Sequence, residues 1–124
     1  KYVGGLLQSN DKVVSVVGET AENGGIEHYY STSGNWVKYP DGALICYGEV
    51  LNNSTTTFQS TFAYTPYVTT TVLATSTTNV YIVYLSNLTT TNFTSQINFQ
   101  PKASSTVWGT SAQTAHYIAI GRWK

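Results

Sequence analysis

Residues 36–51, WVKYPDGALICYGEVL, contain the clearest folding signal in this chain of 124 residues. Pro40, Asp41 and Gly42 form a turn motif, because Pro fixes φ at the first corner, Asp bonds to its own backbone and Gly accepts a positive φ. Apolar runs at 36–39 and 43–51 flank this turn. The stretch therefore predicts an antiparallel hairpin.

The return strand of this hairpin is apolar on both faces. One face carries Ala43, Ile45 and Tyr47, and the other carries Leu44, Cys46 and Val50. Strands that are buried on both sides read as continuous apolar runs. We therefore expect this strand in the centre of a sheet, or covered by a second subunit.

Alternation of apolar and polar residues extends the same pattern along the chain. It predicts further strands at 56–64, 68–75, 80–86, 92–100 and 115–123. The stretch 92–100 is the most regular, with Phe93, Ile97 and Phe99 on one face and amide and hydroxyl residues on the other. Seven close strands without a long amphipathic helix predict an all-β antiparallel sandwich of about six to seven strands. A closed barrel is the alternative.

The chain divides into two parts. Residues 1–33 contain Gly4-Gly5 and Gly24-Gly25, and they predict an N-terminal neck of extended chain or short strands. Residues 34–124 form the predicted β-sandwich head. Because residue 1 is Lys and the chain has no Met, we expect the sequence to be a C-terminal piece of a longer protein.

The composition excludes several classes of partner. Six basic and six acidic residues give no net charge, and only 10% of residues are charged, against about 25% in an average domain. Nucleic-acid binding needs a basic face, so we expect none. No apolar run reaches 18 residues, so we expect no membrane insertion. The 20 Thr, 12 Ser and 9 Asn residues suit an exterior protein that binds hydroxyl-rich ligands.

The reactive side chains do not form a catalytic pattern. His28 and His116 are the only histidines, and we expect His116 to be a packing residue among apolar neighbours. No His, Cys, Asp and Glu spacing fits zinc, and no second carboxylate lies near Glu49 in the sequence. Cys46 is expected to be a buried apolar residue. We therefore expect no enzyme activity, no cofactor and no metal.

Two motifs resemble those of bacteriophage tail-fibre tips. They are GNWVKYPDGALICYG at 34–48 and YIAIGRW at 117–123, at the two ends of the head. The resemblance implies a small β-sandwich similar to the H-type lectin fold. It also implies a homotrimeric receptor-binding protein at the distal end of a tail fibre or tail tip of the virion. Such heads attach to host polysaccharide or teichoic acid, but they share no set of ligand residues that could be transferred here.

Candidate carbohydrate-binding residues therefore come from loop chemistry, since sugars bind to aromatic rings flanked by amides and hydroxyls. The predicted loops offer Asn53, Tyr64, Tyr67, Lys102, Trp108 and Gln113. Trp108 is the foremost candidate, with Lys102 supplying charge for a phosphate-bearing polymer. The alternative is that Trp108 caps the end of the sandwich or the trimer axis.

The leading functional hypothesis is host attachment by a phage receptor-binding head. Two alternatives remain open: a secreted lectin-like module, or a purely structural trimerisation head. Trp123 is expected to pack in the fold, with Arg122 covering its ring or pairing with a carboxylate.

Overall fold

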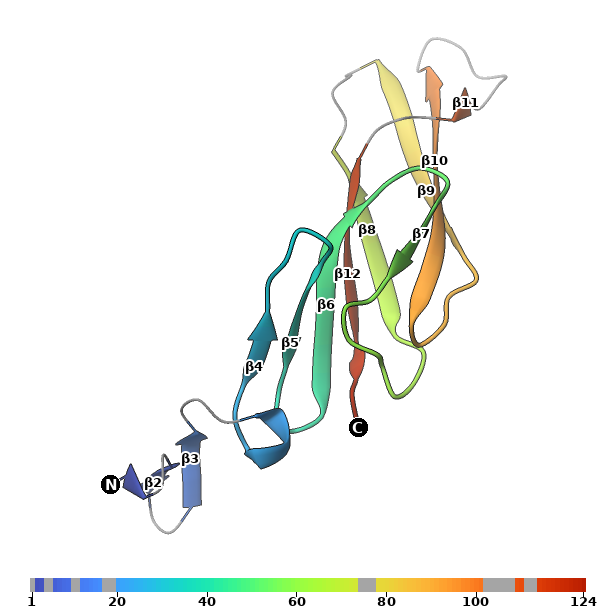
Figure 1. Ribbon diagram of the computed structural model, residues 1–124. Coiled ribbons are helices and arrows are strands. Elements are labelled where there is room, and N and C mark those ends of the chain that lie inside the picture. The colour runs from blue at the N-terminus through green and yellow to red at the C-terminus, as the bar shows by residue number, and fades with distance from the viewer. Residues whose placement is uncertain are drawn as a thin grey trace.

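The computed structural model describes the backbone of residues 2–3, 6–9, 12–16, 20–73, 78–101, 109–110 and 114–124 (Figure 1). Three short strands, β1 (Tyr2–Val3), β2 (Leu6–Ser9) and β3 (Lys12–Val16), form a small antiparallel sheet in the N-terminal segment. A single turn of 3-10 helix, η1 (Ala21–Asn23), then leads into the head.

Two antiparallel sheets form the head. The five-stranded sheet has the order β4 (Glu27–Tyr29), β5 (Asn35–Lys38), β6 (Ala43–Val50), β12 (Ala115–Arg122) and β8 (Tyr67–Val72). The four-stranded sheet is built on β10 (Asn92–Pro101), which pairs with β9 (Asn79–Ser86) along one edge. Its other edge pairs with β7 (Ser54–Thr57) and β11 (Gly109–Thr110). The predicted all-β sandwich is confirmed.

The predicted hairpin is β5–β6, and its turn forms as its residues dictate. Asp41 Oδ1 accepts a hydrogen bond from the backbone N–H of Ala43 over 2.9 Å, and Tyr39 N–H donates to the Ala43 carbonyl over 2.9 Å. Gly42 has φ +101°, a left-handed conformation that favours glycine. A Cβ there would also meet the guanidinium of Arg122, which would have to shift.

The core lies between the two sheets and is rich in aromatic rings. The ring of Phe58 meets Phe62 edge to face at 5.0 Å, and Phe93 meets Tyr117 in the same way at 5.3 Å. The other buried apolar side chains come mainly from the centre of each sheet: Leu44, Cys46, Val50, Ile97, Ala115 and Ala119. The predicted inner face of β10, with Phe93 and Ile97, is confirmed.

One predicted strand was wrong in extent. The prediction covered 56–64, but β7 ends at Thr57 and the chain from 58 to 66 is irregular. Phe58 and Phe62 donate backbone hydrogen bonds to the carbonyls of Thr91 and Thr90, at 2.9 and 3.0 Å, and both side chains are buried. Their burial therefore comes from attachment to a distant segment and not from strand alternation.

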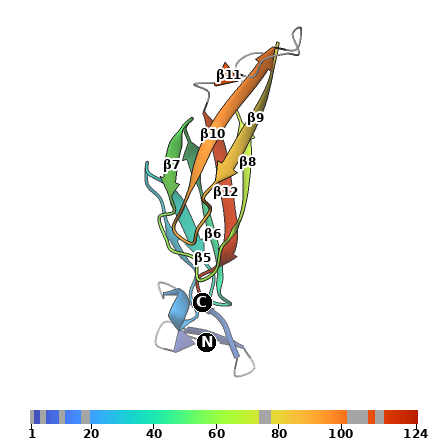
Figure 2. The ribbon, with the colours of Figure 1, turned by 90° about the vertical axis from the view of Figure 1, so that its right-hand side faces the viewer.

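The boundary between neck and head is also visible in the pairing. β4 lies within the range 1–33 that we expected to form the neck, and it pairs antiparallel with β5 as the edge of the five-stranded sheet. Both views place the C-terminus at the end of the head where the N-terminal segment enters (Figure 2). The opposite end of the sandwich is therefore remote from both.

Candidate functional site

The six predicted binding residues do not form one site. Lys102, Trp108 and Gln113 lie outside the described residues. Asn53 is exposed in the turn that precedes β7, with φ +52°. Tyr64 is exposed in the irregular segment, and Tyr67 is the first residue of β8 and 84% exposed.

Asn53 and Tyr67 lie near opposite ends of β6. Tyr67 is paired with Ile120, which is paired with Ile45 near the start of β6. β6 ends at Val50, which is five residues after Ile45, and Asn53 follows in the next turn. At about 3.4 Å per residue the two ends of that strand segment are about 17 Å apart. These two residues therefore cannot contact one small ligand.

The outer face of the four-stranded sheet carries no charged side chain on β7, β9 or β10. Residues 50–101, which include β7, β9 and β10, contain no Asp, Glu, Lys, Arg or His. Opposite residues on antiparallel strands point to the same side, so the register defines the rows of this face. They are Thr55–Thr94–Ser86, then Gln96–Tyr84, Asn98–Ile82 and Gln100–Val80. We call these residues the amide face.

The amide face combines apolar and polar groups in adjacent columns. Val80, Ile82 and Tyr84 are 45%, 40% and 49% exposed along β9. Along β10 beside them, the side chains of Gln96 and Gln100 form no hydrogen bond with the described residues. Each of these amides keeps two donors and an acceptor available to a ligand.

Asn53 adjoins the amide face. Ser54 pairs with Ser95, so the residue before Ser54 lies at the level of the Gln96 row. The turn is held against β10 by two hydrogen bonds: Ile97 N–H to Asn52 Oδ1 and Ser95 Oγ to the Leu51 carbonyl, both 2.9 Å. Of the described candidates, Asn53 is the one that lies at the edge of this face.

The outer face of the five-stranded sheet has a different chemistry. Its central rows are Val37–Ile45–Ile120–Tyr67 and Asn35–Tyr47–Ile118–Thr69. Ile118 and Ile120 are about half exposed, at 48% and 51%. We call these two rows the apolar face. β6 is the third of the five strands, which confirms the predicted position of this strand in the centre of a sheet.

Two hollows share Glu49, at the end of β6. One, of about 370 Å³, is lined mostly by hydroxyls of the 32–33 turn and of β7, together with Leu51 and Gln59. The other, of about 340 Å³, is lined by Asn35, Tyr47 and Ile118, with His116 beside Glu49. Both are open at the surface, and among the described residues Glu49 is the one acidic residue that lines each of them.

His116 corrects the sequence prediction. It was expected to pack among apolar neighbours, but its side chain is 50% exposed, with Nε2 3.7 Å from Glu49 Oε1. The alternation of β12 buries Ala115, Tyr117 and Ala119, and so directs His116 outward. The pair lies in solvent on the sheet surface and lacks an enclosed site around it.

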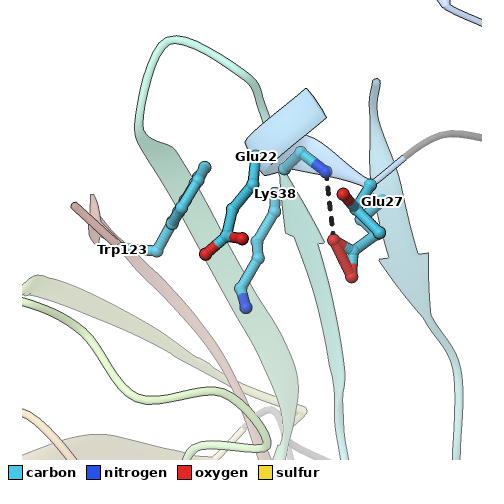
Figure 3. Close-up of a pocket in the computed structure, with 6 residues that line it drawn as sticks. Glu22, Glu27, Lys38 and Trp123 are labelled. Carbon is cyan, nitrogen blue, oxygen red and sulfur yellow. Dashed lines mark hydrogen bonds between the residues drawn. The ribbon is translucent and has the colours of Figure 1, made fainter. Parts of the chain in front are cut away.

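A charged hollow of about 220 Å³ lies where η1 meets the sheet (Figure 3). Lys38 Nζ lies 5.0 Å from the centre of the Trp36 ring and 5.7 Å from that of Trp123. Glu27 Oε2 accepts the Ala21 N–H over 3.1 Å. The hollow is smaller than the usual 300–1,000 Å³ of ligand pockets. The Glu27 carboxylate is already bonded to the Ala21 backbone and the Lys38 ammonium already lies over two tryptophan rings, so we assign this hollow no ligand.

The surroundings of Trp123 confirm packing but correct the expected partner. Arg122 neither covers the ring nor pairs with a carboxylate, because its Nη2 donates to the Asp41 carbonyl over 2.7 Å and its Nε to the Lys124 carbonyl over 3.0 Å. Instead, the ammonium groups of Lys38 and Lys124 lie over the Trp123 ring. These contacts are favourable cation–π interactions.

Reactive groups within the described chain are dispersed. Cys46 is fully buried, as expected, and burial raises the pKa of its thiol to about 11, so it is protonated at neutral pH. No group of three or more His, Cys, Asp or Glu side chains is placed to hold a metal in the part of the chain described. Over those same residues, none of the helices is long and apolar enough to cross a membrane.

Comparisons with family models, with characterised proteins and with solved structures each return no match to this chain. The amide face was not among the sites predicted from the sequence. Its signal was present in the charge-free stretch 50–101 and in the outward column of 92–100. The predicted binding residues were all chosen from loops, and the outward side chains of 92–100 were given no role.

Proposed function

We propose that this protein is the non-enzymatic receptor-binding head of a bacteriophage tail fibre, which attaches the virion to a glycan on the bacterial surface. In this proposal the head is a homotrimer at the distal end of the fibre or tail tip. The motif resemblance at 34–48 and 117–123 supports the phage origin, and the β-sandwich is the fold that this resemblance implies.

One observation supports the proposal most directly: the two outer faces of the sandwich differ in chemistry. The apolar face exposes Ile118 and Ile120 on β12 and Tyr67 on the edge strand β8. Covering such a surface is favourable at about 25 cal/mol per Å². A second copy of the chain is the occupant proposed, because the central rows carry no charged group that would need a complementary partner.

The amide face supports the glycan-binding part of the proposal. It presents amides, hydroxyls and one tyrosine ring without charge. The C-terminus and the N-terminal segment lie together at one end of the head, which leaves the remainder of the sandwich free for presentation (Figures 1 and 2).

The test is binding of the fluorescently labelled head to a panel of bacteria, before and after enzymatic or genetic removal of their surface polysaccharides. The proposal predicts that the head binds some strains and that binding is lost when the polysaccharide is removed. Binding that survives removal of every surface glycan contradicts the function. A head that binds no bacterium, but binds glycans of another origin, favours the secreted lectin-like alternative.

A further inference from the structure

We infer that the amide face is the ligand site, and that its ligand is a neutral, hydroxyl-rich polysaccharide laid across β9 and β10. This inference rests on the proposed function and specifies its site and ligand chemistry. It replaces the loop site expected from Trp108 and Lys102 with a sheet surface, and a phosphate-bearing polymer with an uncharged one.

The first argument concerns charge. The charged residues described from residue 20 onward lie in η1, in the five-stranded sheet or at its ends: Glu22, Glu27, Lys38, Asp41, Glu49, Arg122 and Lys124. None lies on β7, β9, β10 or β11. A polyanion gains most from basic side chains, and the amide face offers it none. The affinity of a neutral ligand does not depend on basic side chains.

The second argument concerns the arrangement of the groups. Tyr84 and Gln96 are directly opposite on neighbouring strands, so their Cβ atoms are about 5 Å apart. The tyrosine ring offers an apolar surface to the C–H side of a sugar ring, and the amide offers donors and an acceptor to its hydroxyls. The next row places Ile82 opposite Asn98, but Asn98 Oδ1 is buried, so this row offers a ligand no exposed amide acceptor.

The third argument is that the face extends beyond one sugar ring. Alternate residues on one side of a strand are about 7 Å apart, so Thr94, Gln96, Asn98 and Gln100 form a ladder along β10. Thr55 and Asn53 widen it on the side of β7. A surface that repeats the same groups in a line is suited to a polymer with a repeating unit.

The experiment compares three variants of the full chain in binding to a strain that the wild-type head recognises. Tyr84→Ala and Gln96→Ala remove one apolar and one amide group from the amide face. Ile26→Ala is the control for loss of an exposed apolar side chain, since Ile26 is 58% exposed between η1 and β4 and lies outside this face. Thermal unfolding verifies that each variant keeps the wild-type fold.

We expect Tyr84→Ala and Gln96→Ala each to weaken binding about tenfold, which corresponds to the loss of one good contact, while Ile26→Ala binds as the wild type. Purified neutral polysaccharide of that strain should compete with the cells, and polyglycerol phosphate should not. Because no charge takes part, binding should change little between about 0.1 and 1 M NaCl.

The outcomes separate this inference from the proposed function. If the head binds cells but both amide-face variants bind normally, or if salt and polyglycerol phosphate abolish binding, the amide face is excluded and the receptor-binding function stands. If the wild-type head binds no cell and no glycan, the proposed function fails, and this inference fails with it.

Discussion

Trp123 Nε1 donates a hydrogen bond to the Tyr39 carbonyl oxygen over 2.8 Å, which joins the end of the last strand to the turn of the β5–β6 hairpin. The backbone N–H of Trp123 donates to the Gly42 carbonyl over 2.9 Å on the other side of the same turn. The ring also packs against the core as a partly buried side chain. Trp123 therefore closes the sandwich at its neck end.

Replacement of Trp123 should destabilise the head in two separable steps. Trp123→Phe keeps an aromatic ring but loses the bond to Tyr39, which should cost about 1 kcal/mol in the free energy of unfolding. Trp123→Ala also loses the packing and should cost about 3 kcal/mol or more. Urea unfolding measures both values. Equal stability of the alanine variant and the wild type would contradict the closing role.

Tyr117→Phe should leave the head as stable as the wild type, or more stable. Tyr117 is 2% exposed, and its hydroxyl oxygen is buried without a hydrogen-bond partner among the described residues. Removing a buried polar group that has no partner is close to neutral or favourable. Urea unfolding tests this, with Tyr117→Ala as the comparison that should lose about 3–5 kcal/mol. A loss above about 2 kcal/mol for the phenylalanine variant would reveal a bond to that hydroxyl.

The head should lose stability at alkaline pH in two overlapping stages. Burial raises the pKa of Cys46 from 9.0 to about 11 and that of Tyr117 from 10.0 to about 12. The folded state therefore retains protons that the unfolded chain releases, and stability falls as pH rises through these ranges. Urea midpoints from pH 8 upward measure the decline. Cys46→Ala should flatten the earlier stage and Tyr117→Phe the later one, and unchanged slopes would refute the assignment.

Lysine on the apolar face should separate the subunits of the proposed trimer. Ile118 and Ile120 point outward from β12, so Ile118→Lys with Ile120→Lys places two charges on that surface without entering the core. Light scattering should give about three times 13.5 kDa for the wild type and 13.5 kDa for the double variant.

Ser86→Lys is the matched control for that measurement. It adds an exposed lysine to the outer face of the other sheet, and it should leave the mass unchanged. A monomeric wild type, or a double variant that keeps the trimer mass, would exclude the apolar face as the contact between copies.

Local sequence signals predicted the parts of the fold that depend on neighbours in the chain. The β5–β6 turn followed from Pro40, Asp41 and Gly42, and the inner face of β10 followed from Phe93 and Ile97. The irregular path after β7 could not be predicted in this way. It is fixed by backbone bonds from Phe58 and Phe62 to carbonyls near residue 90.

The candidate site escaped prediction for the same physical reason. Gln96 is far from Tyr84 and Asn53 in the sequence, and only strand pairing brings the three to one surface. His116 shows the related problem within one strand. Alternation separates its neighbours into two faces, but the sheet that packs on one of them determines which face is buried.

Alternation along β9 and β10 also separates the residues that a ligand would meet from those that hold the head together. Tyr81, Val83 and Ile97 face inward, while Ile82, Tyr84 and Gln96 face outward from adjacent positions. Substitutions at the outward positions change the surface and leave the packing between the sheets intact. In the proposed function, substitutions at these outward positions would alter recognition while the packing between the sheets stays constant.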